Sequence, residues 1–219
     1  MTAECISPIQ GSRARIIRLD SCGVPVTGAG SLIVFDGFVE VQVSPQYEDG
    51  TLYQLRNAKG VFCVNRRGNA QFTRDELNIR FCAIDPDAVV ITTGQELIVT
   101  GAPATGTGFW VKEGEIAARW GLEVWQADAD TCTGTNPRSA YWAWPHLAAG
   151  QLADFTIADD VIEWRVIASS EKANTLWGRG PGAVKYINQV PANAHRGFNI
   201  TYLPLPSVTG CGAVELPAA

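Results

Sequence analysis

The chain has 219 residues, of which 46% are hydrophobic and 18% charged, and its formal net charge is −5. This hydrophobic content excludes a disordered chain, and the length is enough to bury the core of one domain. The acidic balance argues against a protein that binds nucleic acid by neutralising phosphates, because such proteins carry a basic face. Seven Trp and 22 Gly against a single Met favour strands joined by many turns.

The sequence carries no recognisable export or membrane signal. Met1–Cys5 is not basic and no apolar run follows it, unlike a secretory signal peptide. No apolar stretch approaches the length that a bilayer-spanning segment needs. We therefore expect a protein that is made in the cytoplasm and has no membrane partner. Its six cysteines are reduced by default, and oxidation after release from a cell stays open for Cys5, Cys22 and Cys63.

Apolar and polar residues alternate with the period of a strand from end to end. For example, Leu77 and Ile79 alternate with Asn78 and Arg80. Such a pattern indicates one face in the core and one in water, and Cys82 is expected to be a small buried residue. In chain order the predicted strands are 13–19, 32–35, 38–43, 77–83, 97–100, 119–124, 141–147, 162–166 and 198–202.

One short helix is predicted after residue 85. Asp85 suits the N-cap, Pro86 the first helical position, and Gly94 the C-terminal end. Val89 and Val90 are expected to face the sheet. Short strands separated by turns, with one helix, favour a mostly β protein and a β-sandwich over a βαβ fold.

Three segments are predicted to lie outside the regular strands. Residues 44–60 are interpreted as a long loop that carries Leu52, Tyr53 and Leu55, and 127–138 as a second loop. The Pro- and Gly-rich residues 204–219 are interpreted as an extended C-terminal arm, which follows a single β domain at 1–203. Long loops in compact domains are usually functional or mobile.

The two histidines do not predict a catalytic site. A nucleophile–histidine–carboxylate triad needs one of them beside both partners, and nothing in the spacing brings His146 or His195 to such a position. His146 shares the even-numbered face of its strand with Trp142 and Trp144. We therefore expect it to be a packing residue.

Other constellations are equally weak. The carboxylate pairs Asp159–Asp160 and Glu113/Glu115 could serve as glycosidase acids, but solvated turns are the favoured interpretation. The Gly-rich stretches lack the strand-then-helix context of a phosphate loop, and no Cys or His has zinc spacing. The sequence therefore predicts no catalytic, cofactor-binding or metal-binding residue, and a protein that is not an enzyme.

Tryptophans keep a second function class open. Trp120 and Trp164 fall on the apolar faces of their strands, where core burial explains them. Trp125, Trp144 and Trp177 are not explained in this way, and exposed aromatic rings can stack on sugars or mark a protein interface. A carbohydrate- or receptor-binding β-sandwich, such as an adhesin module, therefore stays open, and a β-sandwich hydrolase is a further alternative.

An ordered series of short segments runs through most of the chain, to about Gly180. The series consists of Cys5–Gly11 with Arg13 and Arg15, Arg18–Pro25, Gly37–Pro45 with Glu48 and Gly50, Asn57–Cys63, Leu77–Cys82, Asp85–Pro86, Thr93–Gly94, Leu122–Gln126, Trp144–Leu147 with Gly150, Leu152–Ile157 and Trp177–Gly178. In this order they resemble the major tail protein of long-tailed siphophages that infect actinobacteria.

The resemblance implies a fold and an assembly. It implies a β-sandwich of the phage tail-tube type, with one short flanking helix and extended loops or arms, in hexameric rings that stack into a hollow tube. The implied partners are other copies of the chain, the tape measure protein, the tail terminator and the distal tail proteins. The implied location is the virion tail, which is assembled in the host cytoplasm. DNA passes through the lumen without specific binding, and no catalytic residues are implied. A tail-tip binding module and a capsid decoration protein stay open as alternatives.

The residues themselves suggest how copies could meet. Tyr47, Glu48, Asp49, Leu52 and Tyr53 are expected to contact the next ring, because their loop is long and its apolar residues have no obvious core face. The alternative is a mobile loop that folds back over its own sandwich. Residues 204–219 could also reach a neighbouring ring. Six copies at −5 each carry about −30 formal charges per ring. A tube wall that is not basic lets DNA slide through without binding its phosphates.

Overall fold

The computed structural model describes residues 6–36, 38–102, 105–115, 117–128, 138–156, 163–175, 177 and 190–216. These residues form thirteen strands and one helix. In chain order the elements are β1 (Pro8–Arg18), β2 (Gly28–Phe35), β3 (Phe38–Glu48), β4 (Leu52–Arg56), β5 (Phe62–Arg67), β6 (Gln71–Phe81), α1 (Pro86–Thr93), β7 (Glu96–Thr100), β8 (Thr105–Trp110), β9 (Arg119–Asp128), β10 (Ser139–Leu152), β11 (Trp164–Ser170), β12 (Gly197–Thr201) and β13 (Val214–Leu216).

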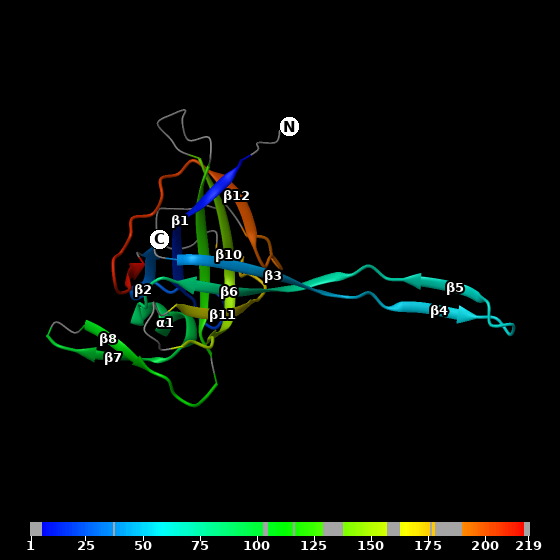
Figure 1. Ribbon diagram of the computed structural model, residues 1–219, viewed down its shortest axis with the longest axis horizontal. Coiled ribbons are helices and arrows are strands. Elements are labelled where there is room, and N and C mark those ends of the chain that lie inside the picture. Colours follow the sequence, from blue (N-terminus) through cyan, green and yellow to red (C-terminus); the bar gives the residue numbers. More distant parts are fainter. Residues whose placement is uncertain are drawn as a thin grey trace.

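Nine strands form one antiparallel sheet in the order β13-β2-β1-β9-β10-β11-β6-β3, with β12 beside β10. The pairing of β10 shifts between Trp144 and Leu147 and again between Ala148 and Gln151, and such bulges bend a strand. As a result the sheet curls, and β3 and β6 run across the direction of β1 and β10 (Figure 1). The protein is thus mostly β and antiparallel, and compatible with a β-sandwich.

The main core lies between the two halves of this curled sheet. It includes Ile16 of β1, Ile79 of β6, Leu122 of β9 and Leu147 of β10, all fully buried. Every predicted strand overlaps a strand of the structure, although residue 162 lies outside the described residues. Strands β4, β5, β8 and β13 were not predicted.

Helix α1 confirms the prediction at residues 85–94 and closes one end of the core. The Asp85 carboxylate accepts hydrogen bonds from the backbone N–H groups of Asp87 and Ala88, and Gly94 adopts the left-handed conformation at φ 72°. Val89 is buried and Val90 half-buried. No helix in the described part of the chain has the length and apolar character to cross a membrane. The prediction for Cys82 is wrong, because β6 ends at Phe81 and the thiol that follows is exposed.

Residues 44–60, predicted as a loop, are mostly strand. β3 and β6 stay paired from Phe38 opposite Phe81 to Glu48 opposite Gln71, and β4 then pairs with β5. The result is one long hairpin whose outer part projects far from the body (Figure 1). We call residues 47–72 the arm and its terminal hairpin, residues 52–67, the arm tip.

The C-terminal segment does not project from the body in its described part. Strand β13 pairs with β2, and Thr209 exchanges hydrogen bonds with Val34. The backbone N–H of Gly212 donates to Asp85 at 2.7 Å, and that of Ala213 donates to Asp87 at 2.9 Å. Residues 204–216, predicted as part of an extended arm, therefore lie on their own domain.

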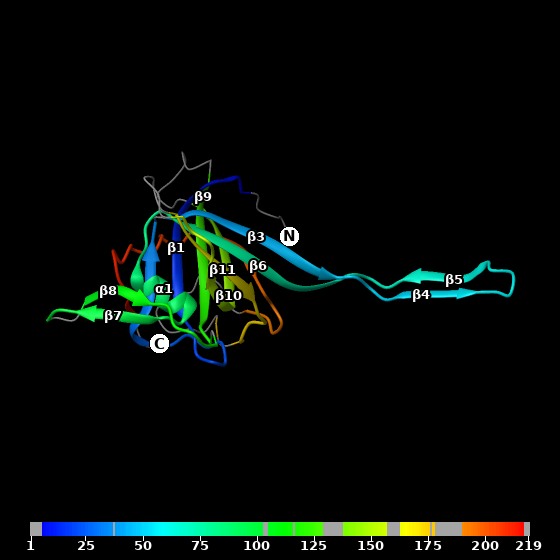
Figure 2. The same ribbon diagram turned by 60° about the horizontal axis from the view of Figure 1, so that its bottom comes forward.

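A second hairpin, formed by β7 and β8, also leaves the body. It projects on the side opposite to the arm, as both views show (Figures 1 and 2). Val99, Trp110 and the following Val111 are exposed on it. The molecule thus carries two protruding β-hairpins, one at each end of its long axis.

Candidate functional site

The five residues predicted to contact another ring all lie on the arm. Tyr47 and Glu48 end β3, Asp49 follows them, and Leu52 and Tyr53 begin β4. All five are exposed, with Tyr47 at 63% and Tyr53 at 59% of their full accessible area. The structure therefore brings them together on one protruding element, and it does not fold them back over the sandwich.

The arm carries further apolar side chains besides the predicted contact residues. They are Leu55, which the sequence already places in this loop, and Val61, Phe62, Val64 and Phe72, all of them exposed. A local signal for them exists, because Asn57 and Gly60 form the turn between β4 and β5: the Asn57 side chain accepts from the N–H groups of Lys59 and Val61, and Gly60 has φ 77°. A connection of about three to five residues that contains Gly and joins two apolar runs indicates a hairpin.

The arm has little to stabilise it in isolation. Every residue of β4 and β5 is exposed. An isolated two-stranded ribbon is marginal in water, and each of its strands also presents an unpaired backbone edge. Burying one large apolar side chain contributes about 1.5–3 kcal/mol of stabilising free energy. Several such side chains left in water therefore predict a surface that another molecule covers.

The arm tip is also basic. Residues 52–67 contain four cations, Arg56, Lys59, Arg66 and Arg67, and no acidic residue. Removing these four from the 17 basic residues leaves 13 against 22 acidic ones, which is a net charge of −9 for the rest of the chain. A basic, apolar tip on an acidic molecule is electrostatically complementary to another copy of the same molecule.

One cluster of possible catalytic groups is brought together, contrary to the prediction. The Oγ of Ser170 lies 2.9 Å from Nδ1 of His195 and accepts a hydrogen bond from the N–H of Asp75. The Asp75 carboxylate, however, accepts from Arg196 and Trp144. A triad needs the carboxylate on the histidine and an accessible nucleophile, whereas Ser170 is buried. The cluster fits a structural role that ties β6, β10 and β11 to the segment before β12.

Other predicted residues lie in the core. His146 is buried, as predicted, and its Nδ1 lies 3.1 Å from the carbonyl oxygen of Lys172. Trp125, Trp144 and Trp177, which the sequence left open as ligand platforms, are all buried. Their burial removes them as surfaces on which a sugar could stack.

Two of the hollows among the described residues are lined by aromatic side chains. A groove of about 450 Å³ between β3, β9 and β10 is lined by Trp142 and Phe38, with Glu40 and Arg196 at its polar side. Trp142 is half-buried there, and its ring centroid lies 4.7 Å from that of Phe198. An aromatic wall beside charged groups has the chemistry that could hold a small polar ring.

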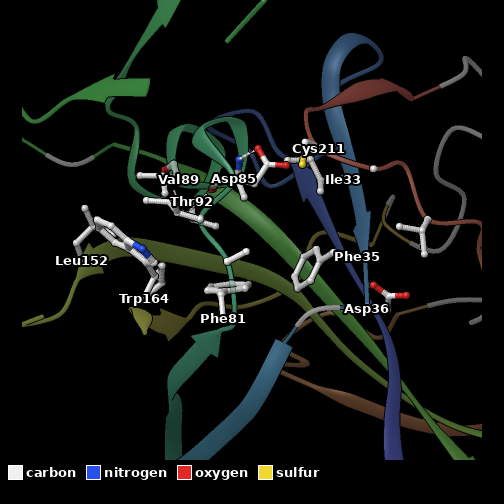
Figure 3. Close-up of a pocket in the computed structure, with 16 residues that line it drawn as sticks. Ile33, Phe35, Asp36, Phe81, Asp85, Val89, Thr92, Leu152, Trp164 and Cys211 are labelled. Carbon is white, nitrogen blue, oxygen red and sulfur yellow. Dashed lines mark hydrogen bonds between the residues drawn. The ribbon is translucent and has the colours of Figure 1, made fainter. Parts of the chain in front are cut away.

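The second hollow is an apolar pocket of about 280 Å³ beside α1. Figure 3 shows Phe35, Phe81 and Trp164 around it, with Asp85 and Cys211 on the side of the helix N-terminus. The Asp85 carboxylate is already engaged by the helix cap and by Gly212. The pocket is therefore mostly apolar, and its lining also includes the Cys211 thiol and Asp36, which pairs with Arg13.

The remaining candidates form no constellation. Glu113 and Glu115 are exposed after β8, while Asp159–Asp160 lies outside the described residues. Among the described residues, no group of three His, Cys, Asp or Glu side chains is placed to hold a metal ion. Comparison of the chain with protein-family models gives no match, and neither does comparison with curated proteins. The arm is therefore the feature of the chain that says most about its function.

Proposed function

We propose that this protein is a structural subunit of a siphophage virion, which self-assembles into stacked hexameric rings that form the tail tube. The observation that carries the proposal is the arm, an exposed ribbon of apolar and basic residues on an otherwise acidic molecule. In a monomer such an element stays in water. In an assembly its apolar side chains become buried and its strand edges can pair with a neighbouring copy. The ordered sequence segments that resemble major tail proteins give the assembly its form.

In the assembled tube the protein would contact several partners. They are other copies of the chain, the tail terminator and the distal tail proteins at the ends of the tube, and the tape measure protein inside it. The acidic balance outside the arm tip supports a wall that does not hold DNA, because a basic lumen would bind phosphates. The protein acts in the virion tail, is assembled in the host cytoplasm and has no enzymatic activity.

Removing the arm tip tests this function. Gly50 and Gly68 lie side by side at its base, where the N–H of Gly68 donates to the carbonyl oxygen of Thr51. Residues 52–67 can therefore be replaced by an Asn-Gly turn without stretching the body. We expect the shortened protein to fold and to stay monomeric in light scattering, whereas the full chain forms rings or tubes in negative-stain microscopy over a concentration series.

A milder pair of variants controls for lost stability. Tyr53→Ser with Leu55→Ser removes apolar groups from the arm, and Ile167→Ser with Val214→Ser removes exposed apolar groups from the body. We expect only the first pair to reduce assembly. Tubes of normal stability from the shortened chain would contradict the role of the arm, and a monodisperse monomer of the full chain at every concentration would contradict the proposed function.

The groove beside Trp142 supports a second candidate, a carbohydrate- or receptor-binding module of a tail tip or adhesin. Its half-buried ring, with Glu40 and Arg196 close by, is the feature that a sugar site would use. Titration of the protein with a panel of soluble oligosaccharides, followed by tryptophan fluorescence, tests it. Saturable quenching that Trp142→Ala abolishes would favour this module, and no response from any sugar would reject it.

A further inference from the structure

The β7–β8 hairpin presents a surface that is opposite in charge to the arm tip. We call Trp110 at the end of β8, with Val111, Glu113 and Glu115 of the segment that directly follows it, the acceptor face. All four side chains are exposed, with Trp110 at 59%. Neither glutamate takes part in an ion pair among the described residues, whereas the neighbouring Lys112 pairs with Glu96. The face therefore combines two apolar side chains with two negative charges that have no ion-pair partner in the described part of the chain.

The arm tip has the matching character. Lys59 and Arg66 are exposed and have no ion-pair partner in the described part of the chain, while Arg67 is held by Asp49. Exposed apolar residues stand beside these cations at Leu55, Phe62 and Val64. Apolar groups with positive charge on one surface and apolar groups with negative charge on another are the two halves of a specific interface.

The two surfaces cannot meet within one molecule, because they project to opposite sides of the body (Figures 1 and 2). Contact between them requires a second copy. Since the two surfaces differ, the contact is heterologous, and each added copy leaves one arm and one acceptor face free. Repetition of this contact generates a ring or a filament with a defined direction.

We propose that the arm tip of one copy docks on the acceptor face of the next copy. The inference depends on the proposed self-assembly and names the surface that receives the arm. It assigns a role to the β7–β8 hairpin, whose exposed Trp110 and Val111 have no role in the core.

Charge reversal on each side provides the test. One variant carries Glu113→Lys and Glu115→Lys, and the other carries Lys59→Glu and Arg66→Glu. Each variant alone places like charges together, so we expect its critical concentration for assembly to rise by about tenfold or more. In an equimolar mixture, the acidic arm meets the basic face and the basic arm meets the acidic face. The mixture is therefore expected to assemble like the original protein.

A control variant and a folding check accompany the test. Asp36→Lys with Glu215→Lys makes the same change in net charge as Glu113→Lys with Glu115→Lys, but away from both hairpins, and is expected to assemble normally. Urea midpoints check that every variant folds. Assembly of the Glu113/Glu115 variant at the original concentration, or a mixture no better than its components, would overturn this inference and leave the proposed function standing. A full chain that never assembles would overturn both.

Discussion

Replacing Arg15 with Met tests how the outer face of the sheet is held together. Arg15 of β1 stands opposite Glu123 of β9, and its guanidinium binds both carboxylate oxygens, one of them at 2.8 Å. The hydroxyl of Tyr141 donates to the same carboxylate at 2.6 Å, and the guanidinium lies 5.5 Å from the centre of the Trp125 ring. The side chains are 12% exposed for Arg15 and 4% for Glu123.

The expected cost follows from this burial. Arg15→Met leaves a buried carboxylate without its cation, and breaking a buried pair from one side costs about 3–5 kcal/mol of unfolding free energy. The pair between Arg67 and Asp49 is a matched control, because its side chains are 58% and 76% exposed. Arg67→Met is expected to cost less than about 1 kcal/mol.

Urea unfolding followed by tryptophan fluorescence measures both costs, below the concentration at which the chain assembles. A third variant, Arg15→Met with Glu123→Gln, removes the buried charge and keeps an acceptor for Tyr141. We expect it to recover a large part of the lost stability. If Arg15→Met costs no more than Arg67→Met, the buried pair does not stabilise this face and the reasoning is refuted.

Two further predictions concern the helix end and the pH. Asp85→Ala removes the helix cap and the acceptor for the N–H of Gly212. We expect it to lower the free energy of unfolding by about 1–2 kcal/mol and to speed amide exchange at Gly212. Asp85→Asn keeps the cap and is expected to lower it less, so that equal losses would contradict the capping role. Hydrogen bonding from Arg80 holds the pKa of Glu163 below its ordinary value. The stabilisation that this lowered pKa represents is therefore complete above that ordinary value and is lost as the pH falls through the folded-state pKa. Carboxyl NMR should show the low pKa return to normal in Arg80→Met, and an unchanged value would contradict the assignment.

The buried half of the fold could be predicted from the sequence. Leu77 and Ile79 alternate with polar neighbours because one face of β6 meets the core and the other does not. The helix was predicted with its cap and its end, because Asp85 and Gly94 act through hydrogen bonds to residues a few positions away. These signals are local, and a single sequence contains them in full.

Much of the candidate site could not be predicted in this way. Both faces of β4 and β5 are exposed, so burial imposes no alternation, and residues 44–60 resembled a loop. The five arm residues were found through their lack of a core face. The turn at Asn57 and Gly60 is a local signal of a hairpin, but neither the distance to which the ribbon protrudes nor its place opposite the β7–β8 hairpin could be anticipated. Periodicity reports which face of a strand is wet, and it does not report which strand lies beside it.

The sequence by itself thus determined the mostly β character, the strands that line the core, and the single capped helix among the described residues. Only the tertiary structure decided that β3 and β6 extend as one ribbon, that residues 204–216 bind Asp85 and Asp87, and that Ser170 meets His195. The physical reason is distance along the chain. Each of these contacts joins residues far apart in sequence, so that no local pattern of hydrophobicity or capping encodes them.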